Sequence, residues 1–133
     1  VRQMTALFTD YAAAVYSALD AVPALTGKIF EFVPNDAPFP KIYIEDAGTQ
    51  DWSTMTDNGL EAEIALHVGS RYNGTKEIRE FFNIIHDTLH NAELSTPDVD
   101  PVLCQFVRSD MVLDTDGKTR HGIIRFRLLI SEV

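Results

Sequence analysis

The chain has 133 residues, of which 45% are hydrophobic and 23% are charged, a composition typical of one soluble globular domain over residues 1–133. Its formal net charge of −9 and its pI near 4.7 argue against a protein that grips nucleic acid, because such binding depends mainly on Lys and Arg that neutralise phosphates. The single cysteine, Cys104, excludes an intramolecular disulfide and a metal site built on several thiolates.

Membrane and export signals are not evident in the sequence. No apolar run approaches the ~20 residues of a membrane-spanning helix, and the N-terminus lacks a basic segment followed by an apolar one. We therefore expect a cytosolic protein without a membrane partner.

The chain is predicted to open with an amphipathic helix over residues 2–22. Its apolar positions recur every three or four residues and form one stripe, consisting of Met4, Leu7, Phe8, Tyr11, Val15, Leu19 and Val22. Pro23 and Gly27 end the helix. Two short strands are predicted next, at residues 28–33 and 41–46, with a proline-rich break between them.

A polar stretch, residues 47–59, is predicted to be a loop, and it contains Asp51, Trp52 and Asp57. Long loops in small domains are usually functional or disordered until bound. A lone Trp on a polar loop more often packs against its own domain than serves as an anchor, but Trp is also enriched at binding hot spots. This loop is therefore a candidate interaction surface.

The clearest strand pattern covers residues 60–71. One face would carry Leu60, Ala62, Ile64, Leu66 and Val68, and the other Glu61, Glu63, Ala65 and His67. Alternation of this kind predicts one face in the core and the other in water or at an interface.

A second helix is predicted after Thr75, which suits an N-cap position. Its buried stripe is expected to contain Ile78, Phe81, Phe82, Ile85, Leu89 and Ala92. Residues 95–101, with two prolines, then link this helix to the C-terminal strands.

The chain is predicted to end in a long β-hairpin with strands Val102–Leu113 and Arg120–Ser131. Asp116 and Gly117 in the connection are typical of a hairpin turn, because Gly adopts a positive φ without steric cost. The second strand alternates cleanly and would place Ile124, Phe126, Leu128 and Ile130 on its core face.

The first strand of this hairpin is expected to give four residues to the core, namely Leu103, Val107, Met111 and Leu113. The expected register places Met111 opposite Ile124. Asp110 would then lie opposite Arg125, a favourable cross-strand pair.

The predicted order is α-β-β-β-α-β-β, and most strand connections are hairpins or loops. We therefore predict an α+β fold, with a mostly antiparallel sheet, both helices packed on one face, and a long C-terminal hairpin.

Two histidines one helical turn apart, His86 and His90, could hold zinc on one helix face. The residue after His86 is Asp87, where zinc hydrolases use Glu, and no third ligand is evident, whereas catalytic zinc usually has three protein ligands. Polar histidines beside a packed face are the favoured interpretation.

The acidic residues around Gly117, which are Asp110, Asp114 and Asp116, do not have the spacing of an EF-hand. Asp and Gly are instead what solvated turns use. Because no nucleophile elbow or phosphate-binding glycine loop is present, we expect no catalytic site, no metal and no cofactor, and a protein that is not an enzyme.

Four stretches, taken in order, resemble one family. They are residues 11–19, Pro38-Phe39-Pro40-Lys41-Ile42-Tyr43-Ile44, His67-Val68-Gly69-Ser70-Arg71 through Gly74 with the helix to Leu89, and Asp114-Thr115-Asp116-Gly117-Lys118-Thr119-Arg120-His121-Gly122 with Ile124 and Phe126. The family is that of the tail-completion, or tail-terminator, proteins of long-tailed bacteriophages and related gene transfer agents. Val68-Gly69 departs from it, since a bulkier residue is expected there.

The resemblance implies a structural assembly protein that forms a hexameric ring, ends the tail tube and joins it to the head connector around the DNA channel. The implied partners are further copies of the chain, the major tail tube protein and a head–tail connector or stopper protein, with DNA passing through without specific binding. The implied locations are the bacterial host cytoplasm during assembly and then the tail–head junction.

Within this interpretation we expect two interaction surfaces. The loop at residues 47–59, with Asp51, Trp52 and Asp57, is expected to contact a neighbouring subunit or the tail tube. The hairpin tip, with Asp114, Asp116 and Lys118, is expected to reach the adjacent subunit or a ring face.

Three other interpretations stay open from the sequence. The chain could belong to a neighbouring connector ring of similar fold, it could be a small enzyme or metal protein that uses His86 and His90, or it could be a monomeric domain that binds a small ligand on the uncovered sheet face.

Overall fold

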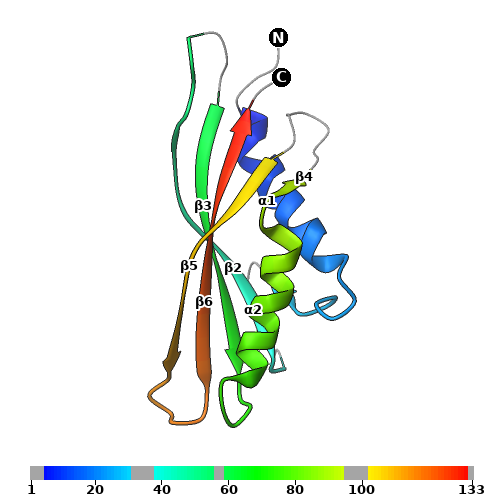
Figure 1. The fold of residues 1–133 in the computed structure, drawn as a ribbon, viewed down its shortest axis with the longest axis vertical. Coiled ribbons are helices and arrows are strands. Elements are labelled where there is room, and N and C mark those ends of the chain that lie inside the picture. Colours follow the sequence, from blue (N-terminus) through cyan, green and yellow to red (C-terminus); the bar gives the residue numbers. More distant parts are fainter. Residues whose placement is uncertain (1–4, 31–37, 56–58, 95–101, 132–133) are drawn as a thin grey trace.

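The computed structural model describes residues 5–30, 38–55, 59–94 and 102–131. These residues form two helices and one six-stranded sheet (Figure 1). The elements in chain order are α1 (Thr5–Asp20), β1 (Ile29–Phe30), β2 (Lys41–Asp51), β3 (Gly59–Ser70), α2 (Lys76–Leu89), β4 (Ala92–Leu94), β5 (Val102–Leu113) and β6 (Arg120–Ser131).

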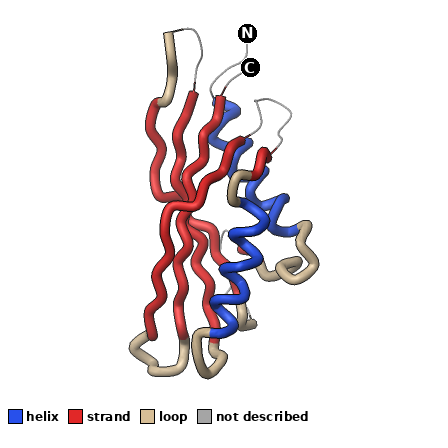
Figure 2. The backbone as a smooth tube through the Cα atoms, in the orientation of Figure 1, coloured by secondary structure: helices blue, strands red, loops and turns tan. Residues whose placement is uncertain are grey.

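The strands lie in the order β1-β2-β3-β6-β5-β4, and all neighbours are antiparallel except β1 and β2. Figure 2 shows that the four long strands twist across one another and that both helices lie on the same side of them. The predicted α+β class, the mostly antiparallel sheet and the long C-terminal hairpin are confirmed.

The core forms where alternating side chains of β3 and β6 meet the helices. The predicted inward residues of both strands are buried, namely Leu60, Ala62, Ile64, Leu66 and Val68 on β3 and Ile124, Phe126, Leu128 and Ile130 on β6. From the helices, Tyr11, Val15, Leu19, Ile78, Phe81, Ile85 and Leu89 join the same cluster. The periodicities of two and of 3.6 residues therefore predicted this core correctly.

Helix α2 begins after Thr75, as the sequence predicts, but without the expected capping bond. The Thr75 side chain makes no cap hydrogen bond, and its hydroxyl instead accepts from Nε of Arg79 at 3.2 Å. Glu77 in the first turn accepts a 2.6 Å hydrogen bond from the Ser70 hydroxyl. This bond ties the start of α2 to the end of β3.

The prediction of one loop over residues 47–59 is wrong at both ends. Strand β2 continues to Asp51 and β3 begins at Gly59, with an irregularity in the pairing between Asp46 and Thr49. Beside this irregularity the Tyr11 hydroxyl donates to Oδ1 of Asp46 at 3.0 Å. The polar composition that indicated a loop is that of a solvent-exposed hairpin strand.

The second helix is shorter than predicted, and a strand follows it. It ends at Leu89, and Asn91 adopts a positive φ of 57°, which turns the chain back into β4. Ala92, predicted on the helical stripe, instead pairs with Cys104 of β5. A three-residue strand is too short for a period-2 pattern to reveal it.

The predicted register of the last hairpin is also wrong. Met111 lies opposite Gly122, and Arg108 rather than Asp110 lies opposite Arg125. A bulge between Phe106 and Arg108 inserts one residue and reverses the alternation along β5.

The strand β5 contributes fewer core residues than predicted. Because of the bulge, Leu103 pairs with Leu129 on the face away from the helices, and the inserted Val107 is about half exposed. Leu113, at the end of the strand, is also about half exposed, whereas Met111 packs against the core as predicted. Cys104 is fully buried instead, and burial raises the pKa of its thiol to about 12.

Gly122 on β6 sets how closely α2 can approach the sheet. A Cβ atom at this position would lie 2.6 Å from Cγ2 of Ile78 and 2.7 Å from Cζ of Phe82. Gly122→Ala should therefore lower the free energy of unfolding by about 1–3 kcal/mol, as overpacked cores do. Urea denaturation measures this loss.

A second substitution provides the control for this prediction. Phe82→Leu removes the Cζ atom and should recover part of the loss when it is combined with Gly122→Ala. A Gly122→Ala protein as stable as the parent would contradict the close approach of α2.

Candidate functional site

One face of the sheet carries no helix, and we call it the open face. On β3 it displays Glu61, Glu63 and His67, and on β6 the cross-strand partners of this face include Arg125 and Arg127. The alternation of β3 predicted the polar residues of this face correctly, whereas Ala65 on the same face is fully buried. The open face is therefore a charged surface laid across four long strands.

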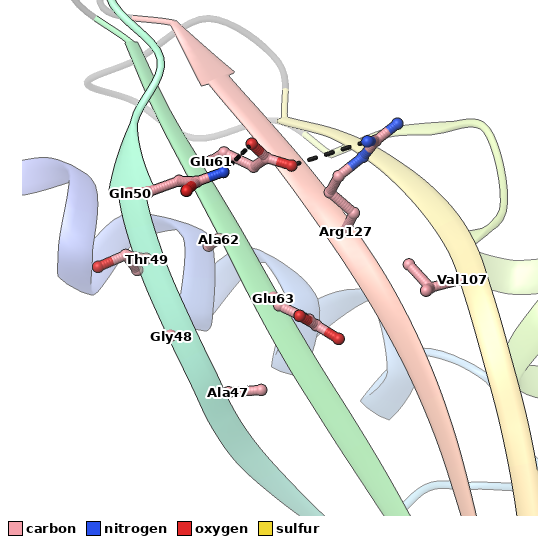
Figure 3. Close-up of a pocket in the computed structure, with 9 residues that line it drawn as sticks. All are labelled: Ala47, Gly48, Thr49, Gln50, Glu61, Ala62, Glu63, Val107 and Arg127. Atoms are coloured by element: carbon pink, nitrogen blue, oxygen red, sulfur yellow. Dashed lines mark hydrogen bonds and ion pairs between the residues drawn. The ribbon is translucent and has the colours of Figure 1, made fainter.

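A groove of about 400 Å³ crosses the open face (Figure 3). Its walls come from β2, β3, β5 and β6 and consist of Ala47, Gly48, Thr49, Gln50, Glu61, Ala62, Glu63, Val107 and Arg127. The irregularity of β2 and the bulge of β5 both border this groove, so its shape comes from the two departures from regular pairing.

A row of polar contacts bridges the four long strands at the groove. Nε2 of Gln50 donates to Oε2 of Glu61 at 2.7 Å, and Nη1 of Arg127 lies 3.7 Å from Oε1 of the same carboxylate (Figure 3). Nη2 of Arg127 also donates to Oε1 of Gln105 at 2.8 Å. Glu63 makes no hydrogen bond or ion pair within the described residues, so its charge is available to a partner.

A second hollow of about 300 Å³ lies near the other end of the same face. It is lined by Phe39, Lys41, Tyr43, His67, Gly69, Asp114, Thr119 and His121. Nδ1 of His67 lies 2.7 Å from Nε2 of His121, and Nε2 of His67 lies 3.1 Å from Oε1 of Glu45. Burial, reinforced by the nearby His67, lowers the pKa of His121, although Asp114 partly opposes this.

The histidine pair favours a structural role over catalysis or metal binding. Its ring nitrogens face one another and Glu45. No group of three or more His, Cys, Asp or Glu is placed to hold a metal ion anywhere in the described ranges. The pairing joins β2, β3 and β6 at this end of the sheet.

The predicted interface residues of the hairpin tip have different roles. Oδ1 of Asp116 accepts the backbone N–H groups of Lys118 and Thr119, each at 2.8 Å, and its Oδ2 accepts the Thr119 hydroxyl at 2.7 Å. Asp116 therefore organises the turn, while Asp114 and Lys118 are exposed. Nε of Arg71 donates to the same Thr119 hydroxyl at 3.4 Å, which fastens the tip to the end of β3.

The predicted interface residues of the other tip, at the end of β2, are exposed. Trp52 is 47% exposed, and its backbone N–H donates to the carbonyl of Gly59 at 3.0 Å. The Ser53 hydroxyl donates to Oδ1 of Asp51 at 2.7 Å and accepts from the Gly59 N–H at 3.0 Å. Met55 is fully exposed beside them, and Asp57 lies outside the described residues.

The structure does not bring the predicted interface residues together. Figure 1 places the end of β2 at the top of the molecule and the β5–β6 turn at the bottom. Asp51 is the last residue of β2, and the turn contains Asp114, Asp116 and Lys118. The two candidate contact points are therefore separated by the length of the sheet.

The His86 and His90 pair is tied into the fold. The two rings stack with centroids 4.6 Å apart, and Nδ1 of His90 accepts the backbone N–H of Phe106 at 3.1 Å. The His86 ring also meets the Phe106 ring edge-on at 5.4 Å. Because Nδ1 of His90 accepts the hydrogen bond from Phe106, the neutral ring carries its proton on Nε2 and has no free lone pair for zinc. The contacts therefore favour the structural interpretation.

Sequence reasoning missed the exposed apolar side chains along β5. Phe106, Val107, Val112 and Leu113 are 37%, 47%, 55% and 52% exposed. The sequence signal was the charged pair Arg108 and Asp110 inside an otherwise apolar strand, which is typical of a strand not fully enclosed in a core. Exposed apolar residues along a strand edge indicate an interaction surface.

The described residues thus form an α+β fold that presents two exposed tips, a charged open face and exposed apolar side chains along β5. A family model described as "Tail completion protein gp17" matches residues 13–131, and the chain belongs to this family. The match contains the whole sheet and both tips.

Two individual proteins agree with this assignment. The chain is 26% identical over 109 residues to the tail completion protein gp17 of Bacillus phage SPP1. The aligned residues cover 80% of this chain and 79% of that protein. It also shares its fold with a chain of the virion of a native gene transfer agent particle, at a TM-score of 0.79 and 19% identity, over 92% of this chain and 96% of that chain.

Family membership gives the chain a structural role in a tail of phage type, where it assembles with other structural proteins. Among the residues that the structure describes, no helix is long and apolar enough to cross a membrane.

Asp116 provides a test of the hairpin tip. Its hydrogen bonds to Thr119 and Lys118 lower the pKa of its carboxyl to about 2. Because the folded protein holds Asp116 ionised more strongly than the unfolded chain does, the ionised carboxylate stabilises the fold above about pH 4, the usual carboxyl pKa. This stabilisation is lost as the pH falls through about 2. Asp116→Ala should lower the thermal midpoint at pH 7, and the difference from the parent should shrink between pH 4 and pH 2.

Asp114→Ala is the matched control. It removes a carboxylate from the same turn, but the carboxylate of Asp114 accepts no hydrogen bond from the described residues. Its thermal midpoint should stay close to that of the parent. Equal destabilisation by both substitutions at pH 7 would show that Asp116 has no special role in the turn.

Proposed function

We propose that this chain forms a ring that ends the tail tube and joins it to the head connector around the channel for DNA. The observation that carries the proposal is the family match over residues 13–131, which includes the open face and both tips. The ring would contain six copies, as the sequence resemblance implies.

The surfaces of the subunit suit such an assembly. A ring is a closed heterologous assembly, in which two different patches of each subunit must match. Opposite edges of one sheet are two such patches, and the two tips at its ends leave further surfaces for partners above and below the ring.

The tips are the proposed contacts with other tail components. The tip with Trp52 and Met55 would contact the major tail tube protein, because two exposed apolar side chains there can enter a pocket on a partner. The tip with Asp114 and Lys118 would reach the adjacent subunit or the connector side, where the stopper protein binds.

The charge of the chain suits a channel through which DNA moves without adhering. A net charge of −9 repels phosphates and provides no counterion release on contact. The subunit would assemble in the bacterial host cytoplasm and remain at the tail–head junction of the finished particle.

Negative-stain imaging of the purified protein with purified tail tubes tests this function. We expect a cap at one end of each tube, with six-fold rings in end-on views. Binding to head connectors but not to tubes would identify a connector ring instead. Protein that binds neither tube ends nor connectors would overturn the proposal.

Substitution of Trp52 tests the contact with the tube. Trp52→Ala should reduce the fraction of capped tubes about tenfold or more, as the loss of a hot-spot residue worth ~2 kcal/mol would. Tyr72→Ala is the matched control, because Tyr72 is a similarly exposed aromatic residue (49%) at the other end of β3.

Both variants should remain folded, since about half of each side chain is exposed and neither belongs to the core, and circular dichroism checks this. If the Trp52→Ala protein caps the same fraction of tubes as the parent, this tip does not make the proposed contact with the tube.

A further inference from the structure

Both edges of the sheet are open at mid-height. Strand β1 pairs only with Ile42 and Tyr43 of β2, and β4 pairs only with residues 102–104 of β5. Among the described residues, no strand pairs with the remaining outer edges of β2 and β5. On β5 the backbone N–H of Phe106 is already donated to Nδ1 of His90, so the free part of this edge lies beyond Phe106. Unpaired backbone N–H and C=O groups on such edges readily accept another strand.

The polarity of the strands allows these two edges to join. The long strands β2, β3, β6 and β5 are each antiparallel to the next, so β2 and β5 run in opposite directions. A second copy placed beside the first, in the same orientation, would therefore bring its β2 next to β5 as an antiparallel pair. Antiparallel pairing is the more stable arrangement.

The rows of the sheet define one register for such a pair. Glu45 lies opposite Ala65, Ala65 lies opposite Arg125, and Arg125 lies opposite Arg108. These four residues form one row on the open face. A second copy joined without a stagger between the two chains would have its Glu45 beside Arg108, and this is the register that the experiments below test.

The charges in this row lack balance within one subunit. Arg108 and Arg125 are directly opposite each other, which is unfavourable for like charges. Arg108 is paired with Asp110 at 3.0 Å, whereas Arg125 makes no hydrogen bond or ion pair within the described residues. The stretch of β2 at the same height, residues 44–51, carries three carboxylates and no Lys or Arg. Oε1 of Glu45 lies 3.1 Å from Nε2 of His67, but its side chain is still 46% exposed and can reach a second partner.

The apolar side chains on the β5 edge agree with the same pairing. Phe106 and Val107 lie directly before Arg108 and are 37% and 47% exposed. In the register above, an incoming β2 strand would bring Ala47 beside Phe106 and Asp46 beside Val107. The contact of Ala47 with Phe106 would bury apolar surface and add to the charge pairing.

We propose that β5 of one copy pairs antiparallel with the outer edge of β2 of the next copy, with Glu45 beside Arg108 of the neighbour. The partner is thus a second copy of this chain, and the sheet continues from subunit to subunit. This inference rests on the proposed ring and names the edges that close it.

Engineered cysteines test the pairing directly. Glu45 and Arg108 are separated within one chain by three strand spacings, about 14 Å, which is beyond the ~7 Å limit between Cα atoms for a disulfide. Any disulfide between cysteines at these two positions must therefore join different copies. Cys104 is buried, with its thiol pKa raised to about 12, and will not compete.

Particles assembled with Glu45→Cys/Arg108→Cys should give, after oxidation, a ladder of linked chains that reaches the size of the closed ring. The matched control, Glu45→Cys/Thr49→Cys, places both cysteines on β2 and should give no ladder. If particles with Glu45→Cys/Arg108→Cys assemble and cap tubes normally but give no ladder, the edge pairing is overturned while the ring function stays intact.

A charge exchange decides the question if the cysteine variant does not assemble. Glu45→Arg and Arg108→Glu should each lower the fraction of capped tubes by about tenfold, and the double variant should restore it. Failure of the double variant to exceed the single ones would overturn the pairing. Parent protein that never caps tubes would instead overturn the proposed function itself.

Discussion

The antiparallel pairing of β3 with β6 is the constraint on which the rest of the structure depends. It runs without interruption from Gly59 opposite Ser131 to Ser70 opposite Arg120. Because side chains alternate along both strands, this one register fixes the face that packs against the helices and the charges on the open face. The outer strands β2 and β5 add to this pair, and each carries an irregularity that shapes the groove.

The sequence was sufficient where a periodic pattern was long and local. The alternation of β3 and β6 and the stripe of α2 predicted the core, and Asp116 with Gly117 predicted the last turn. The sequence was not sufficient where one inserted residue changed the pattern. The bulge at Val107 cannot be seen in the order of apolar residues, and it moved Leu103 and Val107 out of the predicted core.

The candidate site was predicted only in part for a related reason. Exposure of Asp114 and Lys118 follows from turn composition, and the structure agrees. Trp52, for which packing against its own domain was the favoured interpretation, is 47% exposed. The contact of His67 with His121 and the row from Glu45 to Arg108 depend on pairings between residues far apart in sequence. Such pairings require the register, which the composition of a single strand does not contain.

The most direct test of the central claim is a cryo-electron microscopy map of the tail–head junction in particles that carry this protein. The proposed function predicts a ring of six copies between the tail tube and the connector. The further inference predicts that β2 of each copy continues into β5 of the next. A map with this chain elsewhere in the particle, or with no ring of this chain at the junction, would contradict the account.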